Sequence, residues 1–311
     1  MSKQSLISLN PVWTNYAQGL QNSRFIASSI LPILTVSEEE KSGKIPLVSD
    51  ENFEVSKSKR APHAKTPIVN GNPITGFAEY SADLDVLAYG IDITERKGKV
   101  IDLYKHGTMV VSEKVLINRE LRTAALVRAA GKYVHGNTAV VTNKWNVTGT
   151  SDPLADLATA FGVIDTNVGE TKRKIAMGGQ AWKTFRNHPV VKASLSNNVN
   201  QVMTLKLAAE ILEVEEVIVG KSVYKDPITG AKVDIWADDV IIFSTAPPEG
   251  QRTLYTSNFG WTPAVQGFDK GPGIDTFTSE DKLVEYVRAW TWEDSLFHGA
   301  KMGYLLRDVN S

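Results

Sequence analysis

The pattern of apolar positions is strongest in the middle of the chain, where it predicts one long helix. Residues 109–134 contain no proline and are rich in leucine, alanine, arginine, lysine and glutamate, which favour helices. Ile117, Leu121 and Ala124 recur on one face at the spacing of an amphipathic helix. At the rise of an α-helix this segment would be about 38 Å long, which exceeds the average globular helix. We therefore expect it to form the spine of the fold.

Alternating apolar positions predict strands on both sides of this helix. Residues 84–93 alternate, with a change of phase at Leu87–Ala88 that suggests a bulge. Near the end of the chain, residues 283–292 place Tyr286, Trp290 and Trp292 on one face of a strand. The other predicted elements are strands at 172–179, 215–224, 231–236 and 238–246 and helices at 150–162 and 204–214. Helices and strands do not alternate regularly along the chain, so the predicted fold class is α+β.

Residues 44–79 have a different pattern, which predicts a long, thin hairpin. Residues 44–56 place apolar side chains at strand spacing, 57–66 are basic and turn-rich, and the prolines and glycines of 67–79 disfavour a helix. An arm that covers residues 44–56 would reach roughly 40 Å. A compact chain of this length has a radius of gyration of about 20 Å. The hairpin therefore cannot fold flat onto its own body, and we expect it to project.

The first 37 residues are apolar and carry few charges, but they show little regular pattern. A short helix is predicted at 11–20, and Pro32 would end any helix that begins near Phe25. Two interpretations stay open for residues 1–37. The segment either forms the first layer of the chain's own core or lies as an arm on a neighbouring subunit.

Composition excludes several functional classes. The chain has 311 residues, of which 42% are hydrophobic, so it can bury a sizeable core. It contains no cysteine, which excludes disulfides, thiol nucleophiles and thiolate zinc sites. The net charge of −1 gives no global field that would draw the chain to nucleic acid or to an anionic membrane. Without a signal-peptide pattern or an apolar run of the roughly 18 residues that span a bilayer, we expect a soluble protein made in a cytoplasm.

Candidate chemistry is sparse. No nucleotide-binding, metalloprotease or serine-hydrolase motif is present, and the five histidines lie far apart in the sequence. Glu38–Glu39–Glu40 could bind a divalent cation, but adjacent carboxylates on such a segment usually form a solvated face. Asp238–Asp239 could be a carboxylate pair, but neighbouring strand residues point to opposite faces and would not converge. We assign no catalytic residue, no metal ligand and no cofactor, and we expect that the protein is not an enzyme.

The tip of the predicted hairpin is the most basic stretch of the chain. Four cationic residues, called the basic tip below, lie within it: Lys57, Lys59, Arg60 and Lys65. No aromatic residue is interleaved with them, so single-strand stacking on nucleic acid lacks support. A solvated role or a contact between subunits is therefore the better interpretation.

Several phrases of the sequence resemble the major capsid proteins of tailed bacteriophages. The resemblance begins in NPVWTNYAQGLQNSRFIASSILPILTVSEEEKSGKIPLVSDENF, where FIASSILPILTV and SGKIP follow the family's arm and hairpin entry. It continues through KRAPHAK, LINRELRTAALV, SDPLADL, IAMGGQAWKTFRNHPVV, LAAEILEVEEVIVG, DIWADDVIIF and SNFGW. These phrases occur in the family's order and cover most of the chain, and their common order gives the resemblance its specificity.

The resemblance implies the HK97-like capsid fold, with an arm, an extended loop, a peripheral domain and an axial domain. Carried over to this numbering, the arm is 1–37 and the extended loop 38–82. The peripheral domain is 83–149 with spine helix 109–134, the axial domain is 150–275, and the C-terminal strands of 276–311 return to the peripheral domain. Some relatives carry a scaffolding extension or a lysine–asparagine crosslink, neither of which is assigned here, so a separate scaffold is expected if one is used.

The implied function is that of a phage major capsid protein. Many copies would form hexamers and pentamers that close into an icosahedral head around double-stranded DNA, without sequence-specific binding to it. Partners would be other copies of the chain, together with scaffolding, portal or decoration proteins, and no membrane. The protein would lie in the virion, after assembly in the host cytoplasm. Opposite charges on Glu38–Glu40 and on the basic tip could set the register between neighbouring copies.

Three other functional classes stay open. A cellular nanocompartment shell of the encapsulin kind would share the fold but enclose an enzyme instead of nucleic acid. A non-shell structural module, such as a tail or adhesion component, would form rings, tubes or fibres. An enzyme would require carboxylates or histidines that converge in a pocket.

Overall fold

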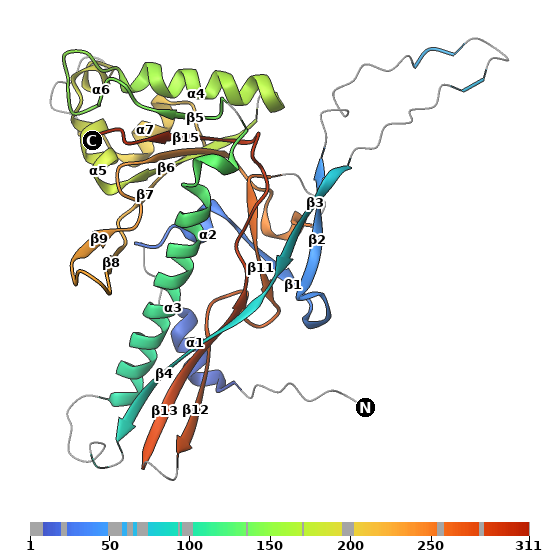
Figure 1. Ribbon diagram of the computed structural model, residues 1–311, viewed down its shortest axis with the longest axis vertical. Helices are drawn as coiled ribbons and strands as arrows, with labels where there is room; N and C mark the ends of the chain where they lie inside the picture. The colour runs from blue at the N-terminus through green and yellow to red at the C-terminus, as the bar shows by residue number, and fades with distance from the viewer. Residues whose placement is uncertain are drawn as a thin grey trace.

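A long helix joins two β-sheets in this protein (Figure 1). The computed structural model describes residues 9–19, 24–48, 58–60, 65–66, 74–92, 94, 102–134, 136–169, 171–194, 202–253, 258–279 and 283–310. Helix α3 (Leu103–Val127) packs against one sheet along its first turns and against the other at its C-terminal end. No helix within these residues is both long and apolar enough to cross a bilayer.

The boundaries of α3 differ from the predicted 109–134. The helix begins at Leu103 because the Asp102 carboxylate accepts hydrogen bonds from Tyr104 N (3.0 Å) and Lys105 N (3.2 Å) and so caps the first turn. It ends at Val127, whose carbonyl accepts a hydrogen bond from the buried Tyr133 hydroxyl (2.7 Å). The chain must leave the helix to bring Tyr133 back to this position. The predicted apolar stripe of Ile117, Leu121 and Ala124 does pack on the core, as expected.

The first sheet has six strands: β1 (Ile33–Val36), β4 (Asp83–Asp92), β11 (Gly260–Val265), β12 (Gly273–Ser279), β13 (Val284–Glu293) and β14 (Leu296–Phe297). Strand β13 lies between β12 and β4, and its register with β4 is continuous from Asp92↔Val284 to Asp83↔Glu293. The bulge predicted at Leu87–Ala88 is therefore absent from β4. The apparent change of phase arises because Leu84 and Val86 point outward, whereas Leu87 and the later apolar residues face α3.

The second sheet has five strands in the order β5 (Thr138–Val140), β15 (Gly303–Arg307), β10 (Val240–Ser244), β6 (Arg173–Gly178) and β7 (Glu216–Gly220). Its core on one side includes residues of α4 (Pro153–Val168), α5 (Gly179–Asn187), α6 (Pro189–Ala193) and α7 (Leu205–Ile211). The end of α3 packs on the other side, so every residue of β10 is buried.

The C-terminal strands divide between the two sheets. Residues 276–311 were expected to return to the body that holds the spine helix and β4. Strand β13 does lie beside β4, but β15 pairs with β10 and β5 in the second sheet. The chain reaches that position because β15 alternates inward-facing residues for both sides of the second sheet, with Leu305 on the α3 side and Leu306 on the opposite side.

The described part of the N-terminal segment packs on the chain itself. Helix α1 (Pro11–Gly19) lies on β12, where the Thr14 hydroxyl bonds with the backbone of Ile274. After α2 (Ala27–Ile30), strand β1 pairs in parallel with β11. Of the two open interpretations, a layer of the chain's own core therefore fits the described residues from 9 to 36.

The histidine at 298 gives the fold a pH dependence. Burial lowers the pKa of His298 to about 4, and its Nδ1 atom has no hydrogen-bond partner among the described residues. Between about pH 6.5 and pH 4, the unfolded chain therefore binds a proton at this histidine that the folded chain does not bind. We expect the free energy of unfolding to fall between pH 6.5 and pH 4, by up to about 3 kcal/mol from this group.

The substitution His298→Gln should reduce this loss in urea titrations of dissociated subunits at several pH values. His106→Gln, at an exposed position of α3, is the matched control and should leave the pH profile unchanged. If the free energy of unfolding fell with decreasing pH equally steeply in His298→Gln and in the native chain, His298 would not be the source of the pH dependence.

Candidate assembly surfaces

One exposed element of the structure is a two-stranded hairpin that belongs to neither large sheet. Strands β2 (Ser42–Val48) and β3 (Ile74–Ser81) pair only with each other and point away from both sheets (Figure 1). Only the root of the hairpin is buried, where Ile45 and Tyr80 join a core with Trp261. Farther along, the Phe77 side chain is 56% exposed. The structure therefore agrees with the expectation that this segment projects.

The direction of the hairpin is fixed at its root. The Tyr80 hydroxyl donates to the Glu40 carbonyl (2.9 Å), and its ring lies so close to Gly43 that a Cβ there would be 2.8 Å from Tyr80 Oη. Next to it, Trp292 Nε1 donates to the Ala82 carbonyl (2.9 Å), and the Lys41 ammonium lies 5.3 Å from the Trp292 ring centroid. These contacts tie both strands to β13, so the arm leaves the body in one defined orientation.

The three glutamates of the sequence form an exposed turn at this root. Glu38–Glu40 adopt a 3-10 turn between β1 and β2, and we call this segment the acidic turn. Glu40 accepts a hydrogen bond from the Ser37 hydroxyl (3.2 Å). Glu38 and Glu39 form no ion pair within the described part of the chain. The carboxylates of the acidic turn are thus available to a partner.

The basic tip lies at the opposite end of the arm. Lys59, Arg60 and Lys65 are exposed, and Lys57 lies outside the described residues. Strand β2 alone spans about 23 Å between the acidic turn and the start of the tip. The structure does not bring the two charged groups together within one subunit, and their pairing between neighbouring copies stays a prediction.

A second exposed surface covers the side of the first sheet that faces away from α3. The registers of β4, β12 and β13 place the following side chains, among others, on this side, and we call them the outer sheet face: Leu84, Val86, Phe277, Tyr286, Arg288 and Trp290. The exposed fractions are 41% for Leu84, 39% for Val86 and 37% for Phe277. On the opposite side of β13, Val287, Ala289, Thr291 and Glu293 are buried, whereas Glu285 is half-buried. An apolar, half-exposed sheet face of this kind marks an interaction surface.

The outer sheet face is held in a fixed arrangement. The Phe277 and Tyr286 rings stack with centroids 4.9 Å apart. The Arg288 guanidinium lies 4.1 Å from the Phe277 centroid and 4.7 Å from that of Trp290. Asp275 accepts hydrogen bonds from Arg288 Nε (3.0 Å) and Trp290 Nε1 (2.8 Å), which locks these side chains. A partner would therefore meet a surface that needs little reordering on binding.

The charged residues of the acidic turn and the basic tip were predicted from the sequence, and their contact between subunits stays a prediction. The outer sheet face was not predicted. The predicted common face of Tyr286, Trp290 and Trp292 is confirmed by their register with β4. The sequence did contain a signal for this face. Leu84 and Val86 alternate out of phase with the later apolar residues because their side chains point outward, and the sequence-based interpretation explained this as a bulge.

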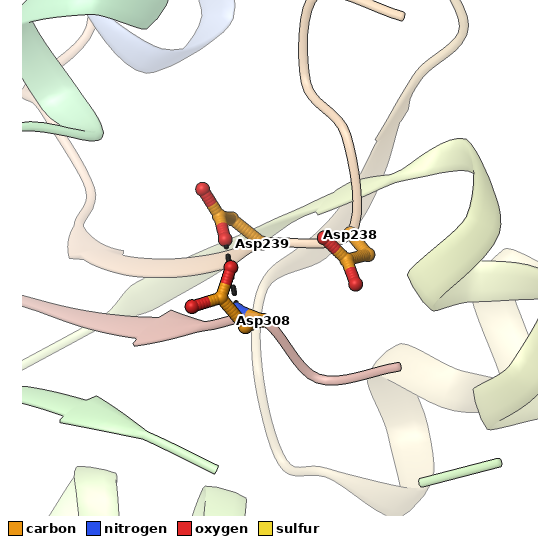
Figure 2. Close-up of side chains that lie close together, drawn as sticks. All are labelled: Asp238, Asp239 and Asp308. Atoms are coloured by element: carbon orange, nitrogen blue, oxygen red, sulfur yellow. Dashed lines mark hydrogen bonds between the residues drawn. The ribbon is translucent and has the colours of Figure 1, made fainter. Parts of the chain in front are cut away.

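The aspartates at 238 and 239 lie together with Asp308, as Figure 2 shows. One carboxylate oxygen from each lies within 4.8 Å of the others, so the expectation that Asp238 and Asp239 would not converge is wrong. Both residues precede β10 in the turn that follows Ala237, and strand alternation does not apply to them.

The chain itself uses the carboxylates of this cluster. Asp239 accepts from Arg128 Nε (2.6 Å) and from Asp308 N (3.0 Å), and Asp238 accepts from Asn310 N (3.2 Å). These bonds join the end of α3, the start of β10 and the chain after β15. The cluster therefore has a structural role in holding the C-terminal residues.

Comparisons with known proteins agree with this architecture. A family model described as phage major capsid protein E matches residues 134–258. The major capsid protein of Burkholderia phage BcepMu is 30% identical over 306 residues, which is 97% of each chain. A solved phage-related protein from Bordetella bronchiseptica RB50 has a TM-score of 0.75 at 20% identity over 98% of each chain. The capsid structure of cyanophage P-SCSP1u has a TM-score of 0.55 at 14% identity and covers 100% of this chain and 93% of that chain. The shared architecture is the HK97-like fold, which confirms the predicted α+β class.

Proposed function

Because this chain belongs to the phage major capsid proteins, we propose that its copies assemble as hexamers and pentamers into an icosahedral head that encloses double-stranded DNA. The observation that supports this most directly is the β2–β3 hairpin, which is anchored in a core of its own subunit at Ile45 and Tyr80 but leaves Phe77 exposed. A closed shell of identical copies covers this side chain at every position. The chain acts as a structural component, and we assign it no catalytic role.

We propose the following division of the chain into parts. Residues 1–37 are the arm, 38–82 the extended loop, 83–149 the peripheral domain and 150–275 the axial domain, except that β5 pairs in the second sheet and that β11 and β12 pair in the first. The core under α4–α7 and the core between α1, α3 and the first sheet support two separate bodies. Residues 276–311 contribute β13 to the peripheral domain and β15 to the axial domain.

The extended loop is proposed to lie on the outer sheet face of a neighbouring copy. Both surfaces expose apolar side chains in the isolated subunit, Phe77 on the loop and Leu84, Val86 and Phe277 on the face. Bringing them together removes apolar area from water. Each contact is modest alone, but a closed shell makes several per subunit, so that they act together.

Charges are proposed to guide these contacts. The acidic turn and the basic tip (Lys57, Lys59, Arg60 and Lys65) provide opposite charges at the two ends of the loop, which favours one register between copies. The net charge of −1 suits a shell that encloses DNA without gripping a sequence. Scaffolding, portal and decoration proteins are the further partners we propose, with assembly in the host cytoplasm.

Electron microscopy of the purified chain tests the proposal. We expect closed, uniform particles, and nucleic acid inside particles recovered from infected cells. Rings, tubes or fibres would instead indicate a tail or adhesion component. Shells that enclose an enzyme would indicate a nanocompartment, which the 30% identity to a phage major capsid protein makes the weaker alternative.

Reversal of charge at the basic tip tests the role of the loop. We expect the double variant Lys59→Glu and Arg60→Glu to fold but to form few or no particles, because its tip meets like charge on the neighbour. The double variant Lys192→Glu and Lys206→Glu changes the net charge equally at exposed axial positions, and it should assemble. Sedimentation velocity and circular dichroism separate loss of assembly from loss of folding. Normal shells from the tip variant would refute the role of these two residues.

A further inference from the structure

A second hairpin projects from the axial body, and it takes no part in the contacts proposed for the extended loop. Strands β8 (Val223–Lys225) and β9 (Lys232–Asp234) form a two-stranded sheet of their own. The flanking Ser222 and Ile235 are buried, but the residues between them are mostly exposed. Ile228, at the apex, is 91% exposed. An isolated two-stranded hairpin is marginally stable in water, so this one is expected to have a partner.

The turn of this hairpin is ordered by Asp226. Its carboxylate accepts hydrogen bonds from Ile228 N and from the Thr229 hydroxyl, both at 2.8 Å. Its backbone N–H donates to the Ala231 carbonyl (2.9 Å), and Gly230 closes the turn with a φ of 69°. The bond from Ile228 N, together with that from Thr229, lowers the pKa of Asp226, so the turn keeps its charge-assisted bonds at neutral pH. The apex is therefore presented as a fixed shape.

Two lysines face each other across this hairpin. Lys225 and Lys232 are directly paired in the antiparallel register, so their side chains leave the same face of the sheet. Neither forms an ion pair within the described residues. Like charges directly opposite each other destabilise a strand pair. The pair lowers its free energy when a carboxylate from elsewhere approaches both ammonium groups.

The two hairpins lie on opposite sides of the molecule. In Figure 1 the β8–β9 hairpin projects on the left and the acidic turn and the β2–β3 hairpin lie on the right. Copies arranged in a ring make head-to-tail contacts, in which one side of each subunit meets the opposite side of the next. A contact between the side that carries the acidic turn of one copy and the side that carries the β8–β9 hairpin of its neighbour is a head-to-tail contact of this kind.

We propose that the β8–β9 hairpin is a docking element for a second copy of this chain, with Lys225 and Lys232 receiving the carboxylates of the neighbour's acidic turn. The charges are complementary, both groups are exposed, and Lys225, Lys232, Glu38 and Glu39 form no ion pair with any residue that the structure describes. Ile228 extends beyond the lysines and adds an apolar contact at the apex. This inference rests on the proposed shell function, and it gives the acidic turn a second partner in addition to the basic tip.

A charge-swap experiment tests the pairing. The double variant Lys225→Glu and Lys232→Glu is expected to fold but to lose closed particles. Adding Glu38→Lys and Glu39→Lys to the same chain restores the attraction and should recover particles. Particles from the hairpin variant at the native yield, or no recovery of particles when Glu38→Lys and Glu39→Lys are added, would overturn the pairing.

Disulfide trapping gives a readout that does not require closed shells. The chain contains no cysteine, so the double variant Glu39→Cys and Lys232→Cys carries only the two introduced thiols. On mild oxidation we expect a ladder of covalent multimers on a non-reducing gel. The control variant Glu39→Cys and Lys206→Cys should stay largely monomeric. A ladder no stronger than the control would overturn the docking, whereas the absence of particles from the native chain would refute the proposed shell function.

Discussion

Replacing Glu293 by alanine is expected to destabilise the subunit by about 3–5 kcal/mol, because it leaves buried arginine without its counter-charge. The Glu293 side chain is 1% exposed and accepts from Arg119 Nε (2.7 Å) and Arg122 Nη2 (2.8 Å). Arg122 also pairs with Asp85 on β4. This network of two cations and two anions joins α3 to β13 and β4 in the interior. Its removal therefore weakens the contact between the helix and the first sheet.

Urea titration of dissociated subunits measures this loss as a lower midpoint of unfolding. The matched control is Glu79→Ala, which removes a glutamate from the exposed ion pair with Lys44 and should unfold close to the native midpoint. A Glu293→Ala subunit as stable as this control would show that water reaches Arg119 and replaces the lost carboxylate.

Replacing Glu120 by alanine is expected to cost about 3 kcal/mol or more, because several buried donors lose one shared acceptor. The Glu120 side chain is 0% exposed. Its carboxylate accepts from Ile26 N and Ala27 N (each 2.9 Å), Trp236 Nε1 (2.6 Å) and the Ser222 hydroxyl (3.2 Å). Burial raises the pKa of Glu120 against the effect of these four hydrogen bonds. The residue joins α2, α3 and the base of the β8–β9 hairpin.

The variant Glu120→Gln separates the charge from the acceptor. The glutamine amide keeps one oxygen acceptor, so Glu120→Gln should lower the free energy of unfolding by less than Glu120→Ala does. Because the pKa of Glu120 is raised in the folded state, the native chain loses stability as the pH rises and this carboxyl group ionises. The difference in free energy of unfolding between the native chain and Glu120→Gln should therefore be smaller at pH 8 than at pH 5. The control is Glu113→Ala on the same helix, at an exposed pair with Arg24. Equal stability of Glu120→Ala and Glu113→Ala would contradict the prediction.

The elements that the sequence predicted well are those with a strong local pattern. Strand β13 lies where the alternation of 283–292 placed it, and the described strands β2 and β3 form the predicted hairpin. The helix boundaries were wrong because they depend on one capping carboxylate at Asp102 and on a tertiary hydrogen bond from Tyr133.

The remaining differences arise from pairings that are distant in the sequence. The place of β15 is set by its register with β10 and β5, which no local pattern encodes. The outer sheet face resembled an ordinary core strand because its half-exposed apolar side chains alternate in the same way as buried ones. The facing lysines of β8 and β9 became visible only once the two strands had a register. Charge could be located from composition, but the orientation of each charged group required the three-dimensional pairing.

Two consecutive residues of α3 connect the two bodies of the subunit. Arg119 is bound to the first sheet, while Glu120 is bound to the backbone of α2 and to the residues that flank the β8–β9 hairpin. No flexible linker separates these attachments. A displacement of that hairpin by a neighbouring copy would therefore be passed to α3 through Glu120 and to the first sheet through Arg119, so that the two bodies would move together.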